Sequence, residues 1–419
     1  NVALGNNALS SADSGANYNI AIGSAAGDAI TTGDSNVGIG LNALGATTTA
    51  SGNIAIGLNA MLANTTGASN VGIGTYALNA NTTASENTAL GYQAGYSTTT
   101  GGANTAVGVK ALYLNTTAVA NTALGWNAAY SNTTGAFNVA IGYQSLASNT
   151  TASQNTAVGY QAGYSNTTGI SLAHFGYQAG RSNTTGDDNS FFGRSSGYST
   201  TTGNYNTGIG RSALALNTTA SKNTAVGYQA AYSNTTAPEV TAVGYKAGYN
   251  STGGYNTFLG YNAGVGQTTG DSNTYIGRGI ASVNTSTGGF NTALGNFALS
   301  RNTSGTSNVS VGQHSLYNNT TASYNTAVGY QSAYSNTTGT ENVALGVFSL
   351  YANTTGIRNT ALGKSAMEVN TTGTDNVAVG VTALDANTTG ANNTALGNFS
   401  LTSNTTASNN TAVGYQAGY

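Results

Sequence analysis

The chain has 419 residues, of which only 5% are charged, with a formal net charge of −2, 59 Gly, one Pro and no Cys. Ten Lys and Arg residues exclude an electrostatic nucleic-acid binder, the sequence has no apolar run of about 18 residues that could span a membrane as a helix, and the missing Cys excludes a disulfide scaffold. Globular domains carry about 25% charged residues. In this protein, Asn, Ser, Thr and Tyr must instead provide the polar groups that the solvent contacts.

A short motif, Asn-(Thr/Val)-Ala-(Leu/Val/Ile)-Gly, recurs along the whole chain. Its last residue, here called the marker glycine, occurs 25 times from Gly5 to Gly414, and 21 of the 24 spacings are 17 residues. The unequal spacings are Gly5–Gly23, Gly244–Gly260 and Gly277–Gly295. A unit this short cannot hold two helices but suits one coil of a solenoid. We therefore predict an all-β parallel β-solenoid of 25 coils, with two short strands per coil, as one continuous array over residues 1–419.

Each repeat begins with an Asn four residues before the marker glycine, present in 23 of the 25 repeats. Equivalent residues of stacked coils lie about 4.8 Å apart, and a side-chain amide offers both a donor and an acceptor. Stacked Asn side chains can therefore hydrogen-bond along the column. We expect a structural asparagine ladder that includes Asn87, Asn104, Asn121, Asn138 and Asn155.

The next three residues form the first predicted strand. The residue before the marker glycine is aliphatic or Phe in all 25 repeats, and the residue two positions earlier is Val, Ile or Thr in 23. The residue between them is mostly Ala or Gly. Both faces of such a strand are apolar, which is typical of strands that are buried on both sides. Since a single chain can cover only one face, we expect the outer face to meet another chain.

Tyrosines form two further columns, one directly after the marker glycine, as at Tyr143 and Tyr160, and one five residues after it, as at Tyr113 and Tyr130. These columns predict aromatic packing between coils, with the hydroxyl groups in water. A stripe that binds glycans or another surface is the alternative interpretation.

The repeat ends in the turn Asn-Thr-Thr-(Gly/Ala), which is rich in turn-forming residues. Its Asn also opens the N-glycosylation sequon Asn-x-(Ser/Thr), so a row of sugars along this edge is the alternative to a simple turn. The candidate acceptors are Asn64, Asn81, Asn115, Asn132, Asn149, Asn166, Asn183, Asn217, Asn234, Asn250, Asn284, Asn302, Asn319, Asn336, Asn353, Asn370, Asn387 and Asn404.

Two regions depart from the pattern. Residues 240–295 contain two of the three unequal spacings and are predicted to form a local bulge or bend.

The repeat around His174 is degenerate, and the second histidine, His314, lies in a distant coil. The pair Asp187 and Asp188 occupies a turn. Because no His, Asp or Glu residues come together, we expect no enzyme site, no metal and no cofactor.

The motif resembles a known family. Asn-Val-Ala-Ile-Gly at 138–142, with variants at 19–23, 36–40 and 342–346, is similar to the head repeat of YadA-type trimeric autotransporter adhesins. The phrase NTAVGYQAGYSNTTG at 155–169 resembles stalk repeats of bacterial and phage tail-fibre-like proteins. The resemblance implies a left-handed β-roll, a homotrimer and display on a cell or virion surface, and it brings no catalytic residues. The adhesin repeat is shorter, so the turn must differ here.

We therefore expect a structural or adhesive extracellular fibre or stalk, a rigid rod that self-associates as a homotrimer or filament and is a segment of a longer protein. A solenoid that binds glycans or ice through its Tyr and Thr faces is the alternative. A polysaccharide-cleaving β-helix would need clustered acidic residues, which the sequence lacks.

Overall fold

The computed structural model describes residues 1–283 and 285–418, which contain strands and turns but no helix. The chain divides into two compact units, Asn1–Asn206 and Thr207–Tyr419. Each strand has three residues and ends directly before a marker glycine. Coils are numbered after their strands, so coil 11 contains β11. Within the described residues, no helix is long and apolar enough to cross a membrane.

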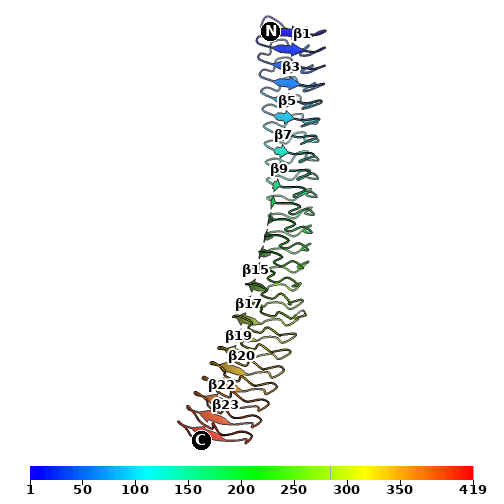
Figure 1. Cartoon of the computed structure of the whole chain (residues 1–419). Coiled ribbons are helices and arrows are strands. Elements are labelled where there is room, and N and C mark those ends of the chain that lie inside the picture. Colours follow the sequence, from blue (N-terminus) through cyan, green and yellow to red (C-terminus); the bar gives the residue numbers. More distant parts are fainter. Residues whose placement is uncertain (284, 419) are drawn as a thin grey trace. The chain divides into compact units, whose positions relative to one another are not determined.

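The first unit is a stack of coils in which every strand pairs in parallel with the strand of the next coil (Figure 1). Its strands are β1 (Val2–Leu4), β2 (Ile20–Ile22), β3 (Val37–Ile39), β4 (Ile54–Ile56), β5 (Val71–Ile73), β6 (Thr88–Leu90), β7 (Thr105–Val107), β8 (Thr122–Leu124), β9 (Val139–Ile141), β10 (Thr156–Val158), β11 (Ala173–Phe175) and β12 (Ser190–Phe192).

The second unit repeats this arrangement with parallel pairs from β13 to β25. Its strands are β13 (Thr207–Ile209), β14 (Thr224–Val226), β15 (Thr241–Val243), β16 (Thr257–Leu259), β17 (Thr274–Ile276), β18 (Thr292–Leu294), β19 (Val309–Val311), β20 (Thr326–Val328), β21 (Val343–Leu345), β22 (Thr360–Leu362), β23 (Val377–Val379), β24 (Thr394–Leu396) and β25 (Thr411–Val413).

The irregular stretch at residues 240–295 keeps its strand register. Thr241 pairs with Thr257 across the short repeat, and Thr274 pairs with Thr292 across the long one. The missing and added residues are therefore accommodated in the segments between strands. An isolated parallel bridge between Gln267 and Ser286 also occurs among these segments.

The predicted parallel β-solenoid with a 17-residue period is confirmed, but the second strand of each coil is not found in the described residues. The second half of the coil is a run of turns in which the residues two and four positions after the marker glycine have positive φ. In coil 10 these are Gln161, with φ of 51°, and Gly163, with φ of 58°. Residues in this left-handed conformation cannot continue a β-strand.

The enclosed core is thin and built from small side chains. The middle residue of every strand from β2 to β25 is buried, and in most coils it is Ala. It packs against the residues three and four positions after the marker glycine. In several coils, a larger middle residue is accompanied by a smaller residue at one of these two positions. Phe191 in β12 faces Gly197, where an added Cβ would come within 2.4 Å of the ring. The large strand residues His174, Phe191 and Phe258 each have a glycine four positions after the marker glycine. The coil of Tyr275 has Ala281 there instead.

The marker glycine is required by close approach of backbone to backbone. Gly108 has φ of 130°, and a Cβ there would lie 2.5 Å from the carbonyl oxygen of Gly125 in the next coil. Any side chain would force the coils apart. This contact explains why the glycine closes all 25 motifs.

Candidate functional site

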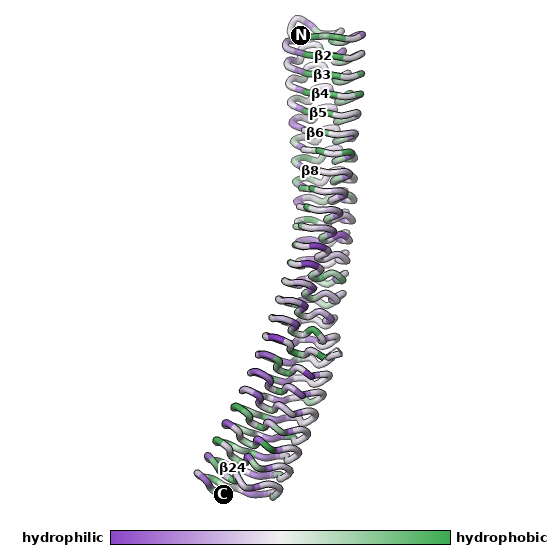
Figure 2. Tube along the Cα trace, in the orientation of Figure 1, coloured by the Kyte–Doolittle hydropathy of each residue, from purple (hydrophilic) through white to green (hydrophobic). Residues whose placement is uncertain are grey.

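The most extensive apolar surface that the chain itself leaves exposed is the outer side of the strands. Because side chains alternate along a strand, the first and third strand residues point away from the core that the middle residue enters. We call these two columns, together with the residue after the marker glycine, the outer strand face. Leu90 is 47% exposed, and Leu124 and Leu396 are each 46% exposed. Figure 2 shows hydrophobic residues recurring at strands β2 to β6 of the first unit.

This orientation corrects part of the sequence-based expectation. The aliphatic residue before the marker glycine was expected to be covered, but in the single chain it is half-exposed. In β8, Ala123 is fully buried whereas Leu124 is not. The small residue takes the inner position in coil 8 because Ala128 and Ala129 fill the rest of the thin core and no glycine there makes room for a larger side chain. The outer face stays uncovered unless a partner covers it.

The outer strand face carries almost no charge. Its strand positions hold only apolar residues, Thr, Ser and Ala. The charged residues on the third column are the cations Arg194, Arg211, Arg278 and Lys364. The first two lie over tyrosine rings of adjacent coils: the Arg194 guanidinium is 5.6 Å from the Tyr177 centroid, and Arg211 is 5.7 Å from that of Tyr228. The surface therefore resembles the apolar centre of a protein interface more than an ionic binding site.

Aromatic side chains stack face to face along the third column of this face. Trp126 and Tyr143 have ring centroids 4.8 Å apart, Tyr143 and Tyr160 5.2 Å, and Tyr160 and Tyr177 5.0 Å, with nearly parallel planes. Sugars bind aromatic residues by lying on the ring face, and here neighbouring rings occupy those faces. The predicted aromatic columns are present, in a geometry that leaves mainly ring edges for a ligand.

The predicted asparagine ladder is confirmed. The Oδ1 atom of Asn87 accepts a hydrogen bond from the backbone N–H of Asn104 at 2.9 Å, and the same contact continues through Asn121, Asn138 and Asn155 at 2.8 to 3.0 Å. Each of these side chains also donates to a backbone carbonyl in the final turn of its own coil. The ladder thus satisfies buried turn backbone and holds adjacent coils together.

The sequon asparagines form a second ladder that sequence reasoning missed. The Nδ2 atom of Asn149 donates to Asn132 Oδ1 at 2.8 Å, and that of Asn166 donates to Asn149 Oδ1 and to the Gly169 carbonyl, both at 2.9 Å. The donor and acceptor argument that identified the first ladder applies equally to this column.

The second ladder argues against glycosylation of most of the candidates in the folded protein. A sugar would have to be attached to a nitrogen that is buried and already donates, so the folded coil cannot carry it. Asn250 and Asn404 are half-buried, and Asn284 lies outside the described residues. The fully buried candidates are Asn64, Asn81, Asn115, Asn132, Asn149, Asn166, Asn183, Asn217, Asn234, Asn302, Asn319, Asn336, Asn353, Asn370 and Asn387.

The first Thr of the Asn-Thr-Thr turn forms a third polar column. The hydroxyl of Thr133 donates to the Thr150 carbonyl at 3.0 Å, and that of Thr150 donates to the Thr167 carbonyl at 3.2 Å. The second Thr of each turn, such as Thr134, is exposed. Because the two hydroxyls of one turn face different surroundings, this turn does not present paired Thr columns to ice.

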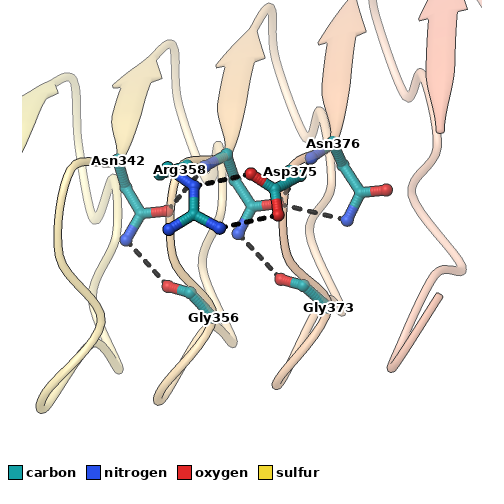
Figure 3. Close-up of polar contacts among 7 residues, drawn as sticks. Asn342, Gly356, Arg358, Gly373, Asp375 and Asn376 are labelled. Carbon is teal, nitrogen blue, oxygen red and sulfur yellow. Dashed lines mark hydrogen bonds and ion pairs between the residues drawn. The ribbon is translucent and has the colours of Figure 1, made fainter. Parts of the chain in front are cut away.

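Charged groups lie on the exposed ridge beside the first ladder. Figure 3 shows Asn342 donating to the Gly356 carbonyl at 2.9 Å inside the coil, while Arg358 contacts Asp375 of the next coil at 2.6 and 2.9 Å outside it. The hydrogen bond from Arg358 lowers the pKa of the Asp375 carboxyl. Since this pair is solvent-exposed, it contributes little to stability.

The remaining titratable groups form no catalytic arrangement among the described residues. No group of three or more His, Asp or Glu residues there could hold a metal ion. Asp187 Oδ1 accepts from the backbone N–H of Ile170 at 2.8 Å, which draws it into a turn contact rather than into a pair with Asp188. His174 is buried in the first unit, and His314 packs on Phe297 in the second.

Comparison of the chain with protein-family models, curated proteins and solved structures yields no match. The similarity to adhesin and tail-fibre repeats therefore rests on the repeat motif alone and stays a prediction.

Proposed function

We propose that this chain is a structural or adhesive extracellular fibre whose copies associate through the outer strand face, as a homotrimer. The observation that carries the proposal is the uncovered apolar column, illustrated by Leu90, Leu124, Leu294 and Leu396, each 45 to 47% exposed. Extracellular display is the part of the proposal that rests on the repeat resemblance.

The size of the face supports association. The strands of the first unit are spaced by about 4.8 Å, so their outer columns form an apolar strip on the order of 500 Å². This strip is near the upper end of the range of about 300–600 Å² for the largest apolar patch of a monomeric protein, and patches of that size are often functional. Two such strips buried against each other total about 1,000 Å², the lower limit for a specific interface.

A non-enzymatic role fits the internal contacts. Asn, Thr and backbone groups that could bind a ligand are instead used to join one coil to the next. The stack is therefore stabilised by nearest-neighbour contacts, as in other repeat proteins. A glycan- or ice-binding role gains no support from the stacked rings or the turn hydroxyls.

Analytical ultracentrifugation tests the proposal. The wild-type protein should sediment as a multiple of the 41.6 kDa chain, with three copies as the expected number. The double variant Leu90→Lys/Leu124→Lys should sediment as a single chain with an unchanged circular dichroism spectrum, since Lys on an apolar interface must be desolvated.

The matched control is Thr83→Lys/Thr117→Lys, which adds the same charge to exposed turn residues of coils 5 and 7. It should assemble normally. A wild-type protein that sediments as one chain at micromolar concentration would refute the proposal, as would equal dissociation of both double variants.

A further inference from the structure

Coil 11 differs from its neighbours at three successive positions. Leu172 replaces the ladder Asn, Ala173 replaces the usual β-branched residue, and His174 occupies the inner strand position that is Ala in coil 10. The backbone N–H of Leu172 donates to Asn155 Oδ1 at 2.9 Å, but the Leu172 side chain has no amide oxygen to accept a hydrogen bond from coil 12. The first ladder is therefore interrupted where an ionisable side chain enters the core.

The imidazole of His174 is enclosed on all sides. The side chain is 0% exposed, and its ring stacks on Phe191 of coil 12 with centroids 5.3 Å apart. A Cβ on Gly180 would come within 2.3 Å of the ring, and one on Gly163 within 3.1 Å of Nδ1. Neither ring nitrogen has a hydrogen-bond partner in the described structure. The site thus accommodates an uncharged ring and offers nothing to stabilise a proton.

The charged groups of coils 10 to 12 lie outside this core. They are Arg181, Asp187, Asp188 and Arg194. Arg181 lies over the rings of Tyr164 and Tyr198, and Arg194 over Tyr177. Asp187 accepts from Ile170, and Asp188 is exposed. These four charged side chains thus contact surface groups or solvent. None of them contacts a ring nitrogen of His174.

We propose that coil 11 is an acid-operated weak point of the first unit, where protonation of the enclosed His174 opens the stack locally between β10 and β12. This device is independent of the proposed fibre function. Because coils contact only their nearest neighbours, one coil can open while distant coils stay closed.

The proton linkage gives the direction and pH window. Burial lowers the pKa of His174 from 6.5 to about 3, since desolvation disfavours the imidazolium. Below pH 6.5 the opened coil binds a proton that the closed coil does not. Stability is therefore complete above pH 6.5 and is lost progressively as the pH falls toward 3. Relative to pH 7.5, the opening equilibrium at pH 4.5 should increase about 100-fold.

Hydrogen exchange of the full chain at pH 7.5 and 4.5, corrected for intrinsic exchange rates, tests this. The reporters are amides that join coil 11 to its neighbours, such as Ala173 N–H on Asn189 and Gly176 N–H on Val158. Their protection should fall by about 100-fold in acid, whereas the amides of coil 6 should change little. Equal pH dependence in coils 6 and 11 would overturn the proposal.

His174→Phe is the matched variant, because Phe191 already occupies this strand position in coil 12, opposite a glycine as His174 is opposite Gly180. It should keep full protection at both pH values. His314→Phe in the second unit and Asp187→Asn beside coil 11 should leave the acid opening unchanged. Persistence of the acid opening in His174→Phe, or its loss in Asp187→Asn, would assign the effect to other groups and refute the role of His174.

Discussion

The two sides of a single strand differ in solvent exposure in this protein. In β8, Ala123 on the inner side is completely buried, whereas Leu124 on the outer side is 46% exposed. Inner positions are completed by the chain itself, through small side chains, marker glycines and two asparagine ladders. Outer positions have no such completion. The comparison shows that the chain itself buries the inner side of each strand, while the outer side is left exposed and is suited to contact a partner.

The largest stability loss should come from a side chain at a marker glycine. Gly108→Ala places a Cβ 2.5 Å from the Gly125 carbonyl oxygen at a φ that L-residues avoid, so we expect a loss of about 3 kcal/mol or more. Hydrogen exchange at coils 7 and 8 measures it. Gly15→Ala, whose Cβ would meet only Thr32 at 3.7 Å, should be nearly neutral. Comparable losses in the two variants would contradict the close-approach argument.

Removal of one ladder side chain should cause an intermediate loss in the free energy of unfolding. Asn138→Ala leaves the Asn155 N–H without its partner and removes one of the two hydrogen bonds to the Ala152 carbonyl, to which Asn149 also donates. This loss should cost about 2 kcal/mol. Denaturant unfolding followed by hydrogen exchange locates the effect. Asn138→Leu should lose less because it fills the volume, as Leu172 does at the same position in coil 11. Wild-type stability in Asn138→Ala would show that the ladder is dispensable.

A smaller effect is expected outside the coil. Arg358→Ala removes the exposed ion pair with Asp375, and its unfolding midpoint should match that of the wild type within error, since solvent screens such pairs. Added salt should not separate the two proteins. A loss as large as that of Asn138→Ala would mean that the outer ridge, too, is part of the stabilising framework.

No mass change is expected at the buried sequons. Protein secreted from cells that perform N-glycosylation should carry unmodified peptides around Asn132, Asn149 and Asn166, because each Nδ2 atom is buried in the second ladder. Peptide mapping before and after enzymatic deglycosylation measures this. A sugar on any of these three residues in the folded protein would contradict the ladder.

Much of the fold follows from periodicity. Repeats of 17 residues, the strand before each marker glycine and the first ladder, including Asn138, could all be predicted because each is a local pattern repeated in phase. The absence of a second strand could not be predicted. The left-handed residue Gln161 gives no signal, since Gln is not a typical residue at positive φ, and Gly163 permits a positive φ without requiring it.

The candidate site was only half predictable. Alternation shows that Ala123 and Leu124 point to opposite sides, but which side is the core depends on the coil's width, a tertiary property. The sequence therefore predicts two apolar faces but does not tell whether Leu124 lies on the inner or the outer one. The burial of the sequon residue Asn149 could not be predicted for a related reason, because a three-residue motif does not reveal whether its side chain is buried.

The most direct test of the account is the accessibility of the outer face in the native protein. The chain has no Cys, so Leu124→Cys and Thr117→Cys each introduce a single reactive thiol, one on the outer strand face and one on an exposed turn. If copies cover this face, a maleimide should label Leu124→Cys far more slowly than Thr117→Cys, and dilution to single chains should remove the difference. Equal labelling rates in the native protein would contradict the account.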